Sequence, residues 1–228
     1  MIEKKIIIGT RGSRLALVQS RWVQDTLQQA CPDLHTELLT IQTQGDIILD
    51  TALSKIGDKG LFTREIENAL LTHQIDLAVH SLKDLPTVSP PGLRIAAIPP
   101  RQDPADVLLS KDHLPLARLP AAAVVLTSSL RRRAQLLHHR PDLQVLDIRG
   151  NVTTRIRKWQ DGPAHALVMA AAGLNRLQLQ NRITERLDPM QFLPACGQGA
   201  LALQIRQDDT DLAARLQTLD DPLARAAV

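Results

Sequence analysis

The feature that most constrains this fold is a unit that recurs along the chain: a short aliphatic run, a polar turn, and a stretch with helical spacing of apolar residues. Three isoleucines at 6–8 precede a polar turn and an expected helix from Arg14. The same order returns after residues 124–126 and 145–148. Short aliphatic strands that alternate with helices pack as a sheet whose faces the helices cover. The sequence therefore predicts an α/β fold.

The length and two Pro- or Gly-rich segments predict two domains. A chain of 228 residues is long for one ordinary domain and sufficient for two small ones. The segments 98–105 and 193–199 flank a stretch of domain size, so we expect a double-stranded hinge there. Domain 1 would comprise 1–99 plus 199–228, and domain 2 would comprise 100–198. A cleft between two lobes is the default ligand site, and ordinary surface loops are the alternative interpretation of both segments.

Composition and cysteine usage exclude several classes of function. Aromatic residues make up only 2% of the chain, which argues against single-stranded nucleic-acid binding by base stacking. Cys31 and Cys196 are the only cysteines and form no disulfide framework or zinc cluster. The longest apolar stretch, 164–174, is too short to span a bilayer. We expect a cytoplasmic monomer with no metal and with neither nucleic acid nor membrane as a partner.

Basic, hydroxyl and amide side chains follow the expected strands where each strand ends. Ligands of open α/β sheets bind at this edge, and the helix N-termini that begin there favour anions. A guanidinium forks onto a carboxylate or phosphate with two hydrogen bonds. The set predicts a ligand with several negative groups, although pairing with surface acids is the alternative for any single arginine. The residues are Arg11, Ser13, Ser81, Lys83, Thr127, Ser128, Ser129, Arg131, Arg132, Arg149, Asn151, Arg155 and Arg176.

Asp84 is expected to be the lone acid among these bases. A carboxylate in a cleft can accept protons or stabilise a developing cation, and Lys83 beside it would keep it ionised. A turn or helix-capping aspartate is the alternative, and without further context it is the better one. His80 lacks an obvious triad partner, so we expect it to be packed or hydrogen-bonded. Cys31 and Cys196 are expected to be structural.

Eight short motifs follow one another in a specific order and spacing, although each motif alone is modest. They are 8–13 (IGTRGS), 45–46 (GD), 59–62 (KGLF), 78–84 (AVHSLKD), 127–132 (TSSLRR), 149–152 (RGNV), 172–174 (AGL) and 197–200 (GQGA). In this set the chain closely resembles the porphobilinogen deaminase family, also called hydroxymethylbilane synthase. The resemblance covers residues 6–209, which is nearly the whole chain.

The resemblance implies a two-lobed fold like that of type 2 periplasmic binding proteins, with a mixed sheet flanked by helices in each lobe and a small third domain. It implies a transferase that joins four porphobilinogen molecules head to tail and releases ammonia, for tetrapyrrole, porphyrin and haem biosynthesis. A dipyrromethane cofactor, attached to a cysteine through a thioether, primes the product. Each pyrrole carries an acetate and a propionate, which suits a row of arginines.

The resemblance also implies roles for individual residues. Asp84 would be catalytic: it would hold pyrrole N–H groups, stabilise the azafulvene-like cation left when ammonia departs, and assist proton transfer. Phe62, with Lys55 and Lys59, would belong to a lid over the site. The residues implied to bind substrate or cofactor, chiefly through carboxylates, are Arg11, Ser13, Gln19, Ser81, Lys83, Thr127, Ser128, Ser129, Arg131, Arg132, Arg149, Asn151, Arg155, Arg176 and Gln198.

One departure from the family pattern concerns the cofactor. The family attaches dipyrromethane to a cysteine in a Gly-Gly-Cys context of the third domain, and neither Cys31 nor Cys196 stands in that context. We expect this chain to stop before that domain and to hold no covalent dipyrromethane. A non-catalytic two-lobed module that binds a polycarboxylate is the alternative function. An arginine-driven nucleic-acid binder is a third, which the scarcity of aromatic residues disfavours.

Overall fold

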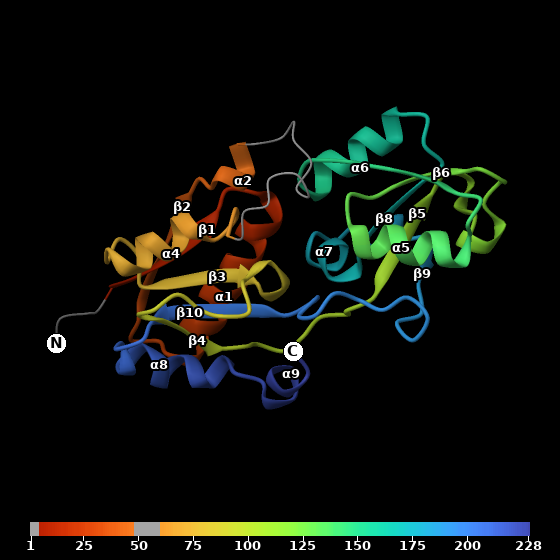
Figure 1. The fold of residues 1–228 in the computed structure, drawn as a ribbon. Helices are drawn as coiled ribbons and strands as arrows, with labels where there is room; N and C mark the ends of the chain where they lie inside the picture. Colours follow the sequence, from red (N-terminus) through yellow and green to blue (C-terminus); the bar gives the residue numbers. More distant parts are fainter. Residues whose placement is uncertain (1–4, 48–59) are drawn as a thin grey trace. The chain divides into compact units, whose positions relative to one another are not determined.

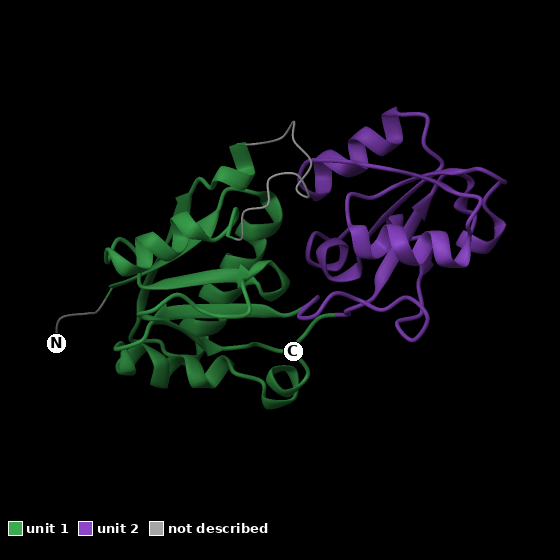
Figure 2. Ribbon diagram, viewed as in Figure 1, with its two compact units in different colours: residues 1–48, 58–102, 200–228 green, residues 49–57, 103–199 purple. Residues whose placement is uncertain are grey.

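A computed structural model describes residues 5–47 and 60–228, and the chain divides into two compact units. Unit 1 comprises residues 1–48, 58–102 and 200–228, and unit 2 comprises residues 49–57 and 103–199 (Figure 2). The chain therefore leaves unit 1 after Gln102 and returns to it at Ala200. Each unit contains a five-stranded sheet.

The sheet of unit 1 has the strand order β2-β1-β3-β10-β4 (Figure 1). β1 runs parallel to β2 and β3, whereas β10 is antiparallel to β3 and β4, so the sheet is mixed. Its elements are β1 (Lys5–Arg11), α1 (Arg14–Ala30), β2 (His35–Ile41), α2 (Gln44–Ile47), α4 (Arg64–Leu71), β3 (Leu77–Ser81), η1 (Leu82–Asp84), β4 (Leu93–Ala97), β10 (Leu201–Arg206), α8 (Thr210–Leu216), η5 (Gln217–Leu219) and α9 (Pro222–Ala226).

The three isoleucines of β1 explain why this strand lies inside the sheet. Side chains alternate between the two faces of a strand, so a strand buried on both faces reads as a continuous aliphatic run. Ile6 and Ile8 pack in one core with Val23 of α1 and Leu212 of α8. Ile7 packs in a second core with residues of α4. Helices thus cover both faces of the sheet.

The sheet of unit 2 has the order β7-β6-β8-β5-β9 (Figure 1). β6 is parallel to β7 and β8, and β5 is antiparallel to β8 and β9. Its elements are β5 (Asp106–Ser110), η2 (Lys111–His113), η3 (Leu116–Arg118), β6 (Val124–Leu126), α5 (Leu130–His139), β7 (Gln144–Leu146), α6 (Val152–Asp161), β8 (Ala166–Ala170), α7 (Ala171–Arg176), η4 (Gln180–Arg182) and β9 (Glu185–Arg186).

β5 separates the two cores of unit 2 in the same way. Leu108 packs in a core with Leu136 of α5, whereas Val107 and Leu109 pack in another with Trp159 of α6. Each unit is therefore a mixed sheet flanked by helices, and the predicted α/β fold class is confirmed. Within 5–47 and 60–228, none of the helices has the length and apolar character needed to cross a bilayer.

Candidate functional site

In unit 1, α1 and the end of β3 place three of the predicted polar residues. Ser13 caps α1, because its Oγ accepts a hydrogen bond from the backbone N–H of Ala16 at 3.2 Å. Gln19 lies two turns along the same helix, is buried, and donates from Nε2 to Oγ of Ser81 at 3.3 Å. Ser81 is the last residue of β3. This contact fastens α1 to the strand end that leads to Lys83.

Lys83 and Asp84 lie in the single turn η1 after β3, and both side chains are exposed. Asp84 makes no hydrogen bond or ion pair with any other residue that the structure describes. The backbone of η1 therefore sets the position of the carboxylate that is predicted to be catalytic. No other described residue binds this carboxylate.

His80, near the end of the same strand, is buried and forms a hydrogen bond between Nε2 and Oε1 of Gln204 at 3.0 Å. Burial and, to a smaller extent, the nearby Arg11 guanidinium lower the pKa of His80 to about 4 against the opposing hydrogen bond with Gln204, so the ring is neutral near pH 7. Gln204 in turn donates to Glu67 of α4 at 3.3 Å. The expected hydrogen-bonded histidine is confirmed, and its contacts fix the strand that carries η1.

Arg11, at the end of β1, is paired with an acid inside unit 1. Its Nε donates to Oδ2 of Asp46 at 3.2 Å, its Nη2 donates to Oδ1, and Thr43 donates to the same carboxylate at 2.8 Å. Partial burial acts to raise the pKa of Asp46, but Arg11 and Thr43 outweigh this and hold the pKa below its usual range. The Phe62 ring packs on the guanidinium of Arg11, with its centroid 4.2 Å from Cζ.

Phe62 is the one predicted lid residue that the structure describes, since Lys55 and Lys59 lie outside the described residues. Its ring also packs on Gly45, where an added Cβ would lie only 2.1 Å from a ring carbon. Glycine is therefore needed at position 45 for the ring to lie there. These contacts place Phe62 beside Arg11 within unit 1, and its role in a lid stays a prediction.

In unit 2, the three hydroxyl residues after β6 shape the turn into α5. Thr127 Oγ1 accepts the N–H of Ser129 at 3.2 Å, and Ser129 Oγ accepts the N–H of Arg132 at 3.4 Å as the cap of α5. Ser128 Oγ both donates to and accepts from the backbone of Ile148, at 2.7 and 2.9 Å. Ser128 thus joins the turn after β6 to the residue that follows β7, whereas Thr127 and Ser129 shape the turn itself.

The turn after β7 is organised in the same manner. Asn151 caps α6, since its Oδ1 accepts the N–H of Thr154 at 2.9 Å. Arg155 donates from Nε to the carbonyl of Gly150 at 2.7 Å. Gly150 has a φ of +119°, a conformation that favours glycine. Arg149, immediately before it, is half-buried in this turn.

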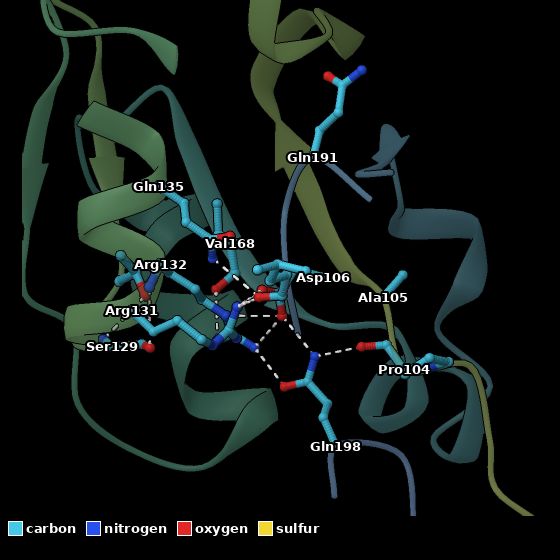
Figure 3. A network of polar contacts seen from close by, with 12 residues as sticks. Pro104, Ala105, Asp106, Ser129, Arg131, Arg132, Gln135, Val168, Gln191 and Gln198 are labelled. Carbon is cyan, nitrogen blue, oxygen red and sulfur yellow. Dashed lines mark hydrogen bonds and ion pairs between the residues drawn. The ribbon is translucent and has the colours of Figure 1, made fainter. Parts of the chain in front are cut away.

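Arg131 and Arg132, in the first turn of α5, both contact the buried carboxylate of Asp106 (Figure 3). Arg132 donates to Oδ1 from Nε at 3.0 Å and from Nη2 at 2.8 Å. Arg131 donates to Oδ2 from Nη1 at 2.7 Å. Gln198 adds a bond to Oδ1 at 2.8 Å and donates to the carbonyl of Pro104 at 2.7 Å. The four side chains form one network within unit 2.

Asp106 is ionised in this network. Burial acts to raise its pKa, but the charge of Arg132 and the hydrogen bonds from Arg131, Arg132 and Gln198 outweigh burial and lower the pKa. Buried charges are stable only when they are paired and hydrogen-bonded, and this one accepts four such bonds.

Arg176 is the last residue of α7 and, unlike Arg131 and Arg132, it has no acid partner among the described residues. Its Nη2 donates to the carbonyl of Gly199 at 2.8 Å, and no carboxylate among the described residues pairs with it. Burial alone lowers its pKa to about 10. A guanidinium that loses water without gaining a counter-anion is a favourable place for an external carboxylate.

The structure corrects one expectation about the acids and leaves the ligand-binding roles as predictions. Asp84 is not the lone acid among the bases, because Asp46 pairs with Arg11 and Asp106 pairs with Arg131 and Arg132. Both acids were missed because their partners are 35 and 25 or more residues away in sequence. The available signal was that Asp106 directly precedes the apolar residues 107–109 of a buried strand.

Over 5–47 and 60–228 the structure places no group of three or more His, Cys, Asp or Glu side chains in a geometry that could hold a metal ion. Cys31 is half-buried, Cys196 is exposed, and both are free thiols.

A family model described as porphobilinogen deaminase, dipyromethane cofactor binding domain, matches residues 6–214. This chain belongs to the porphobilinogen deaminase family. Its relatives of that name include the protein from Desulforudis audaxviator, which is 53% identical over 227 residues and matches 100% of this chain and 74% of that protein. The protein from Syntrophobacter fumaroxidans is 49% identical over 228 residues, again with 100% and 74% coverage. This degree of identity to proteins named as enzymes does not favour the alternative of a non-catalytic binding module.

Solved structures with the same architecture are more distant in sequence. A BenM effector-binding domain solved with benzoate aligns with a TM-score of 0.57 at 16% identity, covering 96% of this chain and 91% of that one. The periplasmic aliphatic sulphonate binding protein of Escherichia coli aligns with a TM-score of 0.50 at 14% identity, covering 94% of this chain and 65% of that protein. These likenesses show the fold alone.

Proposed function

We propose that this chain carries out the family's reaction as a transferase of tetrapyrrole biosynthesis. Porphobilinogen is the family's substrate, and the reaction joins four molecules of it with release of ammonia to give hydroxymethylbilane. The observation that carries the proposal is the family match over residues 6–214, supported by about 50% identity to enzymes of that name along the whole chain. The two free thiols fit a reducing compartment, and we place the reaction in the cytoplasm.

The ligand chemistry of that reaction suits the basic residues of unit 2. Each pyrrole carries two carboxylates, so the growing product gathers negative charge. Arg176 offers a half-buried guanidinium that pairs with no acid among the described residues, and the side chain of Arg131 is partly exposed. We propose that these two arginines bind ligand carboxylates and that Arg149 and Arg155, on the neighbouring turn, do the same. Charge-assisted, two-pronged contacts of this kind fix orientation as well as affinity.

The dipyrromethane cofactor fits the same residues. A group with several carboxylates would supply the missing counter-anion of Arg176, which the described chain does not provide. When bound, the cofactor supplies the free pyrrole end to which the first substrate is joined. Arg131, Arg132 and Arg176 are the residues that would hold its carboxylates, and Ser129 caps the helix that carries the first two.

Asp84 is the residue that we propose for the chemical step. Its carboxylate is exposed and makes no internal contact among the described residues, so it is available to pyrrole N–H groups. Loss of ammonia leaves positive charge on the substrate, and a nearby carboxylate lowers the energy of that state. The same group can accept the proton that is released when the new bond has formed.

Substitution of Asp84 by Asn tests this role. The variant removes the charge and the proton acceptor but keeps the size of the side chain, so we expect ammonia release to fall by about 10²- to 10⁴-fold. Porphobilinogen binding, measured by calorimetry, should remain because the arginines are unchanged. The assay uses the full product of the gene, and Asp25→Asn on the exposed face of α1 is the matched control. A folded Asp84→Asn protein that releases ammonia at the control's rate would contradict the assignment.

A further inference from the structure

Asp106 is a fully buried carboxylate that forms ion pairs with Arg131 and Arg132, the two arginines of α5 that are proposed to bind a ligand. Its side chain is 0% exposed, whereas that of Arg132 is 8% and that of Arg131 is 27% exposed. Exposure therefore increases from the acid through Arg132 to Arg131. Figure 3 shows both arginines converging on Asp106 from the first turn of α5.

The charges in this cluster do not cancel. Two guanidiniums face one carboxylate, so the cluster keeps one positive charge. Arg132 uses Nε and Nη2 on Asp106 and Nη1 on the carbonyl of Val168 at 3.4 Å, which ties it to β8. Arg131 gives Asp106 only one nitrogen, Nη1, which also donates to the carbonyl of Leu193. The surplus charge lies on the more exposed arginine.

We propose that Asp106 is a positioning residue for ligand binding: it holds Arg131 and Arg132 at the head of α5 in the orientation that a ligand carboxylate meets. The inference rests on the proposed function, since the ligand carboxylates are those of a pyrrole substrate or cofactor. Asp106 itself does not touch the ligand, because its side chain has no exposed surface. Its carboxylate fixes the direction of two long side chains that would otherwise sample many rotamers.

The proposal can be separated from simple electrostatics by the sign of one effect. If only the amount of positive charge mattered, removal of the Asp106 charge would strengthen the binding of a dicarboxylate. If Asp106 acts by positioning, removal of its charge releases both guanidiniums and weakens binding, although the net positive charge increases. The two accounts thus predict opposite changes for the same substitution.

The experiment measures porphobilinogen binding by calorimetry for the wild-type chain, Asp106→Asn and Asp106→Glu. Asp142→Asn is the matched control, because it removes one negative charge from the same unit at an exposed Arg140 pair outside the proposed site. We expect Asp106→Asn to bind at least about tenfold more weakly and the control to be unchanged, as is usual when a buried charge pair loses one partner. Asp106→Glu should lie between wild type and Asp106→Asn, because it keeps the charge.

Each outcome bears on the proposal. The proposal is overturned if the affinity of Asp106→Asn for porphobilinogen equals or exceeds that of the control. It is also overturned if Asp106→Asn binds more tightly than Asp106→Glu, because that order indicates that side-chain packing and not charge is what matters. Circular dichroism establishes that each variant is folded. If Asp106→Asn does not fold, Gln198→Ala carries the test by removing one hydrogen bond to the same carboxylate, and unchanged affinity then overturns the proposal. Failure of the wild-type chain to bind porphobilinogen would instead defeat the proposed function.

Discussion

Arg132 is a buried arginine of unit 2 and Arg176 a half-buried one, and they differ in what neutralises them. Arg132 has the carboxylate of Asp106 beside it, at 2.8 Å from Nη2. Arg176 has only the carbonyl of Gly199, and burial lowers its pKa to about 10. The first is a cation whose partner is built into the fold. The second is a cation whose partner the described residues do not supply, and that difference distinguishes a position that organises the site from one that awaits a ligand.

The comparison predicts opposite effects of removing the two charges on the stability of the ligand-free protein. Arg132→Met leaves Asp106 buried with Arg131 and Gln198 as its remaining partners. Loss of one partner from a buried ion pair typically costs about 3–5 kcal/mol, and we expect a decrease in the free energy of unfolding near the lower end of that range. Urea unfolding followed by circular dichroism measures it. If the free energy of unfolding decreases by less than about 1 kcal/mol, the Arg132–Asp106 pair contributes no more than a surface ion pair does.

Arg176→Met should leave the ligand-free protein at least as stable as the wild type. The substitution removes a charge that has lost water without gaining an acid, and the Met side chain fills similar space. Porphobilinogen affinity should instead fall by about tenfold, which corresponds to about 1.4 kcal/mol. Calorimetry measures the affinity and urea unfolding the stability.

Arg182→Met is the matched control for this prediction, because Arg182 is an exposed arginine in the same unit. The control should change neither the affinity nor the stability. An Arg176→Met protein that is destabilised as strongly as Arg132→Met would show that Arg176 is a structural cation, and the contrast between the two arginines would then be lost.

The difference between the two arginines also shows which parts of the candidate site can be predicted from the sequence. The strand ends that carry Arg11, Arg131 and Arg149 follow from aliphatic runs and turn residues, which are local patterns. The acids that pair with Arg11 and Arg131 do not follow from such patterns, because Asp46 and Asp106 meet their partners only after distant segments have packed. Local sequence patterns therefore locate the cations but overestimate how many of them lack an acid within the fold.

The same limit applies to the fold. β10 was not predicted, because Gln204 and Arg206 interrupt its apolar pattern. Both are buried in the structure: Gln204 bonds His80 and Glu67, and Arg206 pairs with Asp76 at 2.7 Å. Polar residues with distant partners thus interrupt the apolar pattern of a strand inside the sheet. The family resemblance identified the fold because it uses the order of motifs along the chain, which records these distant contacts.

The smallest expected effect concerns the Arg11–Asp46 pair of unit 1, which tests whether burial sets the strength of such pairs. Its side chains are 24% and 25% exposed, against 0% for Asp106. A lowered pKa in the folded state means that Asp46 contributes stability above its unfolded pKa and loses it as the pH falls through the folded value. The contribution is therefore present at pH 6 and decreases below about pH 4.

Asp46→Asn should reduce the free energy of unfolding at pH 6 by about 1 kcal/mol or less, since solvent screens a partly exposed pair. The difference from the wild type should shrink as the pH falls below about 4, because protonation of the wild-type carboxylate removes the same charge that the substitution removes. Urea unfolding at pH 6, 4 and 3 measures this change, and Asp25→Asn, on the exposed face of α1, is the matched control. A loss at pH 6 as large as that of Arg132→Met would show that exposure does not separate the two clusters, and the Phe62 ring over Arg11 would then be the feature that shields the pair from water.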